Sequence, residues 1–283
     1  MAVFYNQANL TYSGGSTNSN IVTGEILEVL SVTKNAVNPS FRTGDAVTYV
    51  INIINSGTAP FTGITITDNL GEYTVGGVNV TPLSYIGNTV TYYQNGVLQA
   101  DPTTTSIEPL TITGISVPAG GNTTVIYSAR ANEGAPLAVG STIVNTATLT
   151  GQGITAPLTA TATVSVEAEP VLTITKGINP TVVTENSNVT YTFTIQNLGN
   201  TEAVATDNIV ITDTFNPILE NITVTVNGNT IPQSAYTYDE ASGLFTIPQG
   251  LITVPAASFV QNPQTGEWTL TPGTTVITVT GTI

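Results

Sequence analysis

The sequence predicts an all-β protein made of two tandem β-sandwiches, with an extended arm at its amino terminus. Three observations predict this. Short stretches alternate apolar and polar residues and end at turn residues, as sandwich strands do. A set of motifs occurs twice, and the first residues repeat a stretch from the middle of the chain. The 283 residues, with 26 Gly and 16 Pro, have room for two domains and many turns.

Strand patterns occur throughout the chain. Residues 46–54 alternate and end at the turn 55–57, and residues 63–67 run into Asp68. Residues 122–129 follow the Pro- and Gly-containing turn 118–121. Period-two alternation places one face of each strand in a core. No stretch has the pattern of an amphipathic helix of three turns.

An internal repeat divides the chain. Residues 30–58 align with residues 172–200, and each block is followed by an Ile-Thr-Asp motif, at 66–68 and 211–213. Residues 119–131 then align with 271–283. The first copy continues into IVNTATLTGQG, residues 143–153, whereas the second copy has no such continuation. We therefore expect a first immunoglobulin-like sandwich over 26–168 and a second over 169–283 that lacks its closing strand or strands.

The missing piece has a counterpart at the front of the chain. The stretch FYNQANLTYSGG, residues 4–15, aligns with 143–153 and belongs to an arm over residues 1–25. A sandwich with an open edge associates readily, so we expect the arm to fill the second sandwich of another molecule. Such a contact is heterologous and repeats head to tail. Fraying of the arm, or its return to its own chain, stays an alternative. The aligned pairs are Asn6 with Asn145, Ala8 with Ala147 and Leu10 with Leu149.

Two lysines are the candidates for chemistry. Lys34 and Lys176 are the only lysines and occupy equivalent strand positions in the two copies. A buried lysine has a lowered pKa and becomes a nucleophile, and a buried carboxyl carries protons. The amine would attack an asparagine carboxamide and release ammonia, leaving an amide bond between strands. The predicted sets are Lys34, Asp68 and Asn145 within one molecule, and Lys176, Asp213 and Asn6 between molecules.

These motifs resemble a known family. The order Thr-Lys, Tyr-x5-Asn, Ile-Thr-Asp and Asn-Thr-Ala-Thr is similar to that of tandem β-sandwich repeats in bacterial surface proteins and isopeptide-forming fimbrial subunits. The resemblance covers nearly the whole chain with short motifs. It implies that a lysine on the first strand joins an asparagine on the last, assisted by an acid. The second copy departs from the pattern, since its asparagine is Asn6, at the other end of the chain.

Each candidate lysine, aspartate and asparagine could also have a purely structural role. A strand lysine often extends its amine to water, an aspartate in a turn caps backbone groups, and a buried asparagine satisfies its neighbours. The recurrence of lysine and aspartate in both copies, with an asparagine at the aligned position for each, favours the cross-link. Glu108 and Glu267 precede late strands and remain alternative carboxylates.

The charge excludes several functions. Four basic against eighteen acidic residues give a net charge of −14, which disfavours nucleic acid and anionic membranes as partners. Without His or Cys, no zinc or copper site and no cofactor is expected, and no disulfide forms. A calcium site built from loop carboxylates stays an alternative, although no spaced Asp loop of the helix-loop-helix type occurs. The expected partner is the protein itself, and the only chemistry is a single self-cross-linking turnover. An adhesin with exposed Tyr85, Tyr92, Tyr93 or Trp268 is the alternative, and a hydrolase with paired carboxylates is the weakest reading.

Targeting signals are not recognisable. The start MAVFYNQANL has neither a basic segment nor a continuous apolar segment, so it does not read as a secretory signal. No stretch is long and apolar enough to span a bilayer. The resemblance implies an appendage on a bacterial cell or spore surface, reached by a route that the sequence does not specify. A tip, anchor or receptor protein is not identified by the sequence.

Overall fold

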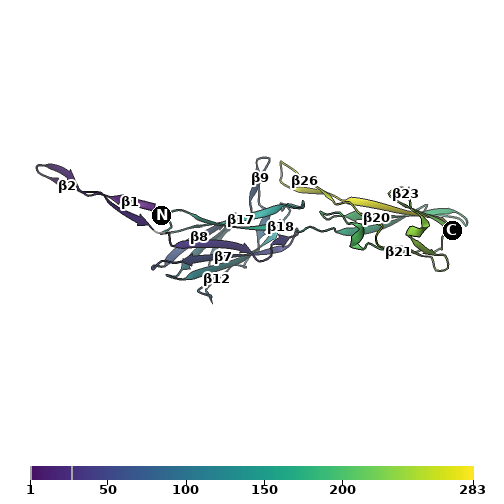
Figure 1. Ribbon diagram of the computed structural model, residues 1–283, viewed down its shortest axis with the longest axis horizontal. Coiled ribbons are helices and arrows are strands. Elements are labelled where there is room, and N and C mark those ends of the chain that lie inside the picture. The colour runs from purple at the N-terminus through teal and green to yellow at the C-terminus, as the bar shows by residue number, and fades with distance from the viewer. Residues whose placement is uncertain (1, 27) are drawn as a thin grey trace.

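Three parts follow one another along an elongated molecule: a hairpin arm, a first sandwich and a second sandwich (Figure 1). The computed structural model describes residues 2–26 and 28–283. The helices within those residues are two 3-10 helices of three residues each, η1 (Ala205–Asp207) and η2 (Gln233–Ala235). Everything else of regular structure is β-strand, so the all-β prediction is confirmed.

The first sandwich packs two sheets face to face. One has the strand order β13-β12-β16-β7-β5, with β11 also paired to β16, and the other has the order β14-β15-β8-β17-β18-β6. Strands β9 and β10 form a separate hairpin. The strands are β5 (Leu30–Ala36), β6 (Ser40–Phe41), β7 (Ala46–Asn55), β8 (Phe61–Asp68), β9 (Tyr73–Val75), β10 (Val78–Val80), β11 (Leu83–Tyr85), β12 (Thr91–Gln94), β13 (Val97–Leu98), β14 (Thr103–Ile107), β15 (Leu110–Val117), β16 (Asn122–Ala131), β17 (Thr142–Thr150) and β18 (Leu158–Val166).

Alternation along β7 explains how this core forms. Val47, Tyr49, Ile51 and Ile53 are buried, while the residues between them are partly exposed. Strand β16 pairs with β7 over nine residues and buries its own alternate positions. β-branched and aromatic side chains pack well on such a pleated face. The strands expected at 46–54, 63–67 and 122–129 are all present, in β7, β8 and β16.

The second sandwich is similar but smaller. Its sheets have the orders β19-β20-β28-β22-β23 and β21-β25-β24, and β26 and β27 form a hairpin beside them. Its buried cluster is separate from that of the first sandwich. The strands are β19 (Leu172–Asn179), β20 (Asn188–Asn197), β21 (Ile211–Thr214), β22 (Glu220–Val226), β23 (Asn229–Thr230), β24 (Thr237–Asp239), β25 (Leu244–Ile247), β26 (Ser258–Gln261), β27 (Trp268–Thr271) and β28 (Gly273–Thr282).

Residues 143–153 are followed by one more strand in the first sandwich. This stretch lies in β17 and the turn after it, but the chain then reverses and β18 pairs along β17, from Thr142 with Ser165 to Leu149 with Leu158. Two strands therefore complete the first sandwich. The inward side chains of β18 are Leu158, Ala160, Ala162, Val164 and Val166, which alternate with exposed polar residues as in the other strands. Among the described residues, nothing pairs with the open edge of β21, the counterpart of β8.

The arm is also two-stranded. Its strands are β1 (Ala2–Asn6), β2 (Asn9–Tyr12), β3 (Gly15–Asn18) and β4 (Val22–Ile26). Strand β1 pairs with β4 and β2 with β3, so that they form one long hairpin that turns at residues 13–14. Residues 3–23 are all exposed, including Phe4 at 51% and Leu10 at 62%. The arm is thus a two-stranded hairpin whose apolar side chains between residues 3 and 23 are exposed.

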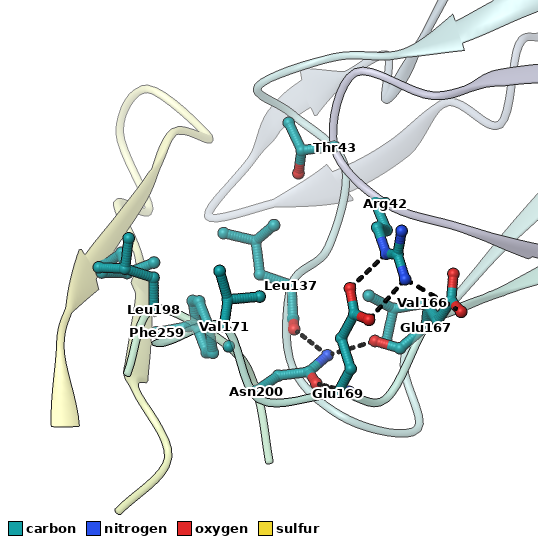
Figure 2. A pocket seen from close by; sticks show the side chains of 12 residues that line it. Arg42, Thr43, Leu137, Val166, Glu167, Glu169, Val171, Leu198, Asn200 and Phe259 are labelled. Atoms are coloured by element: carbon teal, nitrogen blue, oxygen red, sulfur yellow. Dashed lines mark hydrogen bonds and ion pairs between the residues drawn. The ribbon is translucent and has the colours of Figure 1, made fainter. Parts of the chain in front are cut away.

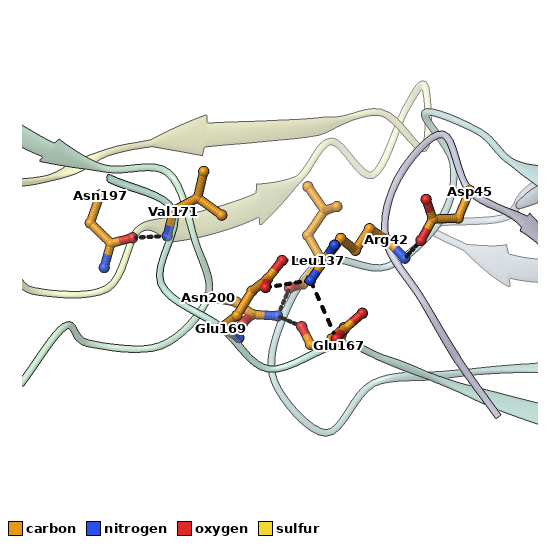
Figure 3. Close-up of polar contacts among 8 residues, drawn as sticks. All are labelled: Arg42, Asp45, Leu137, Glu167, Glu169, Val171, Asn197 and Asn200. Carbon is orange, nitrogen blue, oxygen red and sulfur yellow. Dashed lines mark hydrogen bonds and ion pairs between the residues drawn. The ribbon is translucent and has the colours of Figure 1, made fainter. Parts of the chain in front are cut away.

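An ionic cluster joins the two sandwiches (Figure 3). Arg42 pairs with both carboxylate oxygens of Glu169 and, at 3.3 Å, with Glu167. Asn200 reaches across the joint. Its Nδ2 donates to the carbonyl oxygens of Leu137 (3.1 Å) and Glu167 (2.9 Å), and its Oδ1 accepts the Glu169 N–H at 3.1 Å. Side chains from both sandwiches, Arg42 of the first and Asn200 of the second, therefore hold the joint in addition to the covalent linker.

A cleft of about 270 Å³ lies beside this cluster (Figure 2). Two hairpins meet nearby, β9–β10 of the first sandwich and β26–β27 of the second, where Gln261 donates from Nε2 to the Tyr73 hydroxyl. In the repeat alignment, Arg42 and Asn200 correspond to Thr184 and Thr58. The ionic cluster consequently belongs to this joint alone. The cleft is lined on its apolar side by Leu137, Val166, Val171, Leu198, Phe259 and Leu270.

Candidate cross-linking sites

Lys34 lies inside the first sandwich. It sits on β5, where alternation turns its side chain toward the opposite sheet, and it is 4% exposed. Its Nζ donates to Asp68 Oδ2 at 2.6 Å, and both side chains are fully buried. The amine also lies 4.7 Å from the ring centre of Tyr49. Lys34 therefore does not reach water, and its partner is the aspartate that the sequence predicts.

Asp68 has two roles at the end of β8. Its Oδ1 accepts the Leu70 N–H at 3.0 Å, which is the turn-capping role that aspartate commonly has. Its Oδ2 accepts from both Lys34 and, at 2.7 Å, the Tyr127 hydroxyl. The turn fixes the carboxylate, and the second oxygen is free for the lysine. The structural role and the chemical role are thus compatible in one residue.

Asn145 completes the first site from β17. Ala147 pairs with Asp68 across β17 and β8, so Asn145, two residues away, faces the same side of the sheet. Its Nδ2 donates to the Tyr127 hydroxyl at 2.9 Å. Its Oδ1 is buried and has no hydrogen-bond partner. The structure brings Lys34, Asp68 and Asn145 into one buried network that spans the two sheets.

Two tyrosines, Tyr49 and Tyr127, also lie at this site and are not among the residues that the sequence predicts for it. Tyr49 and Tyr127 are fully buried and stacked, with ring centres 5.4 Å apart. Tyr49 stands in the repeated Tyr-x5-Asn motif, which is a signal for it. Tyr127 has no such motif, because its counterpart in the second copy is Val279. Only the pairing of Tyr127 with Tyr49 across β16 and β7 places it at the site.

Burial shifts the protonation of the site. Removal of water from the ammonium lowers the pKa of Lys34 to about 8, against the attraction of Asp68. Burial also raises the pKa of Tyr127 well above its usual value, and the charge of Asp68 adds to this. The lysine proton is thus held weakly, whereas the tyrosine keeps its proton at physiological pH. An amine of this kind is a competent nucleophile.

The second site has the same pair in a different setting. Lys176 on β19 forms an ion pair with Asp213 on β21, but its side chain is 39% exposed and that of Asp213 is 18% exposed. The amine lies over three aromatic rings, at 4.5 Å from the Tyr191 centre, 5.3 Å from Phe215 and 5.5 Å from Phe193. Lys176 and Asp213 are thus paired as predicted, and the side of β19 that carries Lys176 is exposed to solvent.

An apolar groove lies next to this second site. All eight residues of β19 are exposed, whereas β5, its counterpart, packs Leu30 and Val32 against the core. Ile174 is 53% exposed and Leu172 38%. The groove has a volume of about 310 Å³ and is lined by Leu172, Thr173, Ile174, Ile195, Ile209, Val210, Ile211 and Thr212. The positions that β17 and β18 cover in the first sandwich are therefore uncovered here.

Asn6 is not near Lys176 in this chain. It lies in the arm hairpin, paired with Val22 and exposed to water. The arm projects from the first sandwich at one end of the molecule, and the second sandwich forms the other end (Figure 1). The structure thus assembles two of the three predicted members of the second site. The third member, Asn6, lies in the arm.

The other candidate residues lie away from both lysines. Glu108 and Glu267 are exposed in turns, between β14 and β15 and between β26 and β27, and the carboxylates that contact the lysines are Asp68 and Asp213. Tyr92 is 6% exposed and lies in the core, so it does not form an aromatic surface with Tyr93. Residues 2–26 and 28–283 hold no cluster of three His, Cys, Asp or Glu that would bind a metal. The same residues include no helix suited to crossing a membrane.

Comparisons with known proteins give distant likenesses. No family model and no curated protein matches the sequence. BcpA, the major pilin subunit of Bacillus cereus, is 12% identical with a TM-score of 0.35, over 96% of this chain and 73% of that one. The 35 kDa C-terminal fragment of the Streptococcus agalactiae major pilin GBS80 is 10% identical with a TM-score of 0.35, over 87% and 91%. A family 123 glycoside hydrolase from Clostridium perfringens is 10% identical with a TM-score of 0.32, over 50% of this chain and 27% of that one. These likenesses assign no function, which is inferred below from the residues of this chain.

Proposed function

We propose that this chain is a structural subunit of an extracellular bacterial fibre, in which the arm of one molecule completes the second sandwich of the next. The match between the arm hairpin and the β17–β18 pair carries this proposal. Both are two-stranded hairpins, and Asn6, Ala8 and Leu10 stand where the buried Asn145, Ala147 and Leu149 stand in the first sandwich. Strand addition gains backbone hydrogen bonds and buries the exposed apolar positions of both partners.

The first sandwich supplies the register for the joint. Its β17–β8 pairing opposes Ala147 to Asp68 and Leu149 to Ile66. Transferred to the second sandwich, this register opposes Ala8 to Asp213 and Leu10 to Ile211 on the unpaired edge of β21. Asn6 then takes the place of Asn145, beside Lys176. Because arm and groove lie at opposite ends of one molecule, the partner is a second copy, and the contact repeats head to tail.

Each site then forms one amide bond. Lys34 passes its proton to Asp68, and the neutral amine attacks Cγ of Asn145. The C–N bond to the side-chain nitrogen breaks, and that nitrogen leaves as ammonia after it has gained a proton from the carboxyl. The lysine nitrogen gives its second proton to the carboxylate, so that the new amide carries one N–H and the aspartate ends protonated. Lys176, Asp213 and the Asn6 of another copy react in the same way. Burial and fixed geometry supply most of the rate, because the groups are held together before reaction.

The first bond lies inside one sandwich and the second between molecules. The Lys34–Asn145 bond ties β5 to β17 and restricts the unfolded chain as a disulfide does, but reducing agents do not break it. The Lys176–Asn6 bond converts a strand-exchanged filament into a covalent polymer. Since Asn6 meets Lys176 only when the arm is inserted, this bond forms only in a correctly assembled joint.

The pH dependence of the first bond follows from the pKa of Lys34. The reactive pair holds one proton in total, on lysine or on aspartate, and it loses that proton above about pH 8. The rate of bond formation should therefore be flat from about pH 6 to 8 and fall about tenfold per pH unit above that range. Mass spectrometry of refolding samples measures the rate as loss of ammonia. A rate that rises through pH 8 and then levels would mean that the carboxyl does not supply the leaving-group proton.

A pair of cysteines tests the register without the lysine chemistry. The chain has no cysteine, and Asn9 and Thr212 correspond to the directly paired Thr148 and Thr67. With Asn9→Cys and Thr212→Cys in an Asn6→Ala background, oxidation should give a ladder of multimers that reductant removes, since paired strand positions suit a disulfide. Gel electrophoresis without reductant shows it.

The control for this experiment moves both cysteines. Thr11→Cys with Thr214→Cys lies four residues out of the proposed register and should give few multimers, because that separation exceeds disulfide reach. Equal ladders from both pairs would mean unspecific collision. Monomer alone from the Asn9 and Thr212 pair would reject strand donation and leave a two-domain binding module as the alternative.

A further inference from the structure

We propose that Tyr127 is a catalytic residue of the first site and carries the proton from the Asp68 carboxyl to the leaving nitrogen of Asn145. This inference rests on the amide-forming function proposed above. The Tyr127 hydroxyl lies between the two groups, 2.7 Å from Asp68 Oδ2 and 2.9 Å from Asn145 Nδ2. It accepts a hydrogen bond from the nitrogen that must depart.

The direction of the hydrogen bonds assigns the atoms. A tyrosine hydroxyl has one proton, and here it goes to the Asp68 carboxylate. The oxygen can then only accept from Asn145, which must present its NH₂ group to Tyr127. The carbonyl oxygen of Asn145 is left without a partner, as observed. The reacting amide is thus oriented by Tyr127, with its leaving nitrogen toward the proton source.

Lys34 and Tyr127 contact the same oxygen of Asp68. The amine donates to Oδ2 at 2.6 Å and the hydroxyl to the same atom at 2.7 Å. The proton that Lys34 gives up therefore arrives at the atom next to Tyr127. During the reaction, Tyr127 takes this proton from Oδ2 and passes its own to Nδ2, so that it ends as a neutral hydroxyl. The Lys34 nitrogen gives its second proton to Asp68 as the amide forms. One C–N bond forms, one breaks, ammonia leaves, and Asp68 ends protonated.

The second site does not share this hydroxyl. Val279 occupies the position of Tyr127, opposite Tyr191 in the pairing of β28 with β20, as Tyr127 is opposite Tyr49. Packing alone would be satisfied by an apolar side chain at this position, since Val279 is fully buried in its own core. The hydroxyl of Tyr127 is therefore a feature of the intramolecular bond rather than of the sandwich.

The test compares two buried hydroxyls in an Asn6→Ala background, where only the first bond can form. The proteins are unfolded, refolded by dilution, and quenched over time for intact mass. Tyr127→Phe should slow the loss of ammonia by about 100-fold or more, the usual effect of removing a general acid. Tyr92→Phe removes another buried hydroxyl of the same core, which donates to the Ser116 carbonyl away from the site, and it should leave the rate within about threefold.

The possible outcomes distinguish failure of the Tyr127 relay from failure of the proposed amide-forming function. Circular dichroism follows refolding, so the rate is compared only between folded proteins. If the parent protein loses no ammonia, the cross-linking function fails. If it does and Tyr127→Phe reacts at the parent rate, or both phenylalanine variants are slowed equally, the relay is overturned. A slowed Tyr127→Phe whose rate loses the fall above pH 8 supports the relay, since the carboxyl proton then no longer reaches the nitrogen.

Discussion

Replacing Asn6 with alanine is expected to abolish the multimers that survive boiling in detergent and reductant. In the proposed joint, Asn6 supplies the carboxamide that Lys176 attacks, and within the described residues the hydrogen-bond partner of the Lys176 amine is Asp213. Alanine has no carboxamide, so the second bond cannot form, although the arm keeps its strand pattern. A denaturing gel of parent and variant measures this directly.

The matched control is Asn20→Ala. Asn20 is an exposed asparagine of the same arm, between β3 and β4, and should leave the ladder unchanged. A ladder that persists in Asn6→Ala would remove Asn6 as the acceptor. A single monomer band in every sample would remove the covalent polymer, and microscopy would then show whether filaments form by strand exchange alone.

Replacing Asn145 with alanine is expected to cause the largest loss of stability. The Lys34–Asn145 bond would close a loop of roughly 110 residues, and a cross-link over such a length contributes about 4–5 kcal/mol in the chain-entropy account. The variant should keep the full mass of its chain, without loss of ammonia at the first site. The melting temperature of the first sandwich should fall by roughly 10–20 °C. Calorimetry and intact mass together measure both effects.

A second variant separates the bond from the hydrogen bond that Asn145 also makes. Lys34→Arg leaves a cation for the buried Asp68 but removes the nucleophile, because a guanidinium does not lose its proton. It should lose the mass change and the stability as Asn145→Ala does, and the double variant should lose little more. An Asn145→Ala protein that melts at the parent temperature would contradict the first bond.

Local sequence patterns, namely strand alternation and turn motifs, predict much of both sites. Alternation around Lys34 places it on the inward face of its strand with Val32, and the same holds for Lys176 and Ile174. The Ile-Thr-Asp turns bring a carboxylate to each lysine because a turn aspartate fixes its own orientation. Such features depend on neighbours a few residues apart. They are therefore visible in the sequence and recur in both copies.

Other features depend on residues far apart in the chain. The alternation of β18 indicates a strand, but that it pairs along β17 as a second closing strand is decided by the tertiary structure. The joint cluster of Arg42 with Glu167 and Glu169 joins positions more than a hundred residues apart and has no counterpart in the repeat. No pattern in the sequence indicates it, because it exists only once the sandwiches are packed end to end.

The sequence by itself determined that this protein is all-β, that its sandwich occurs twice, and which lysine and aspartate pair in each copy. Those properties follow from period-two alternation and turn chemistry, which act between near neighbours. Only the tertiary structure decided that Tyr127 bridges Asp68 and Asn145, and that the arm is a hairpin with residues 3–23 exposed. These facts depend on how two sheets face each other, and the distances between sheets are set by packing rather than by local pattern.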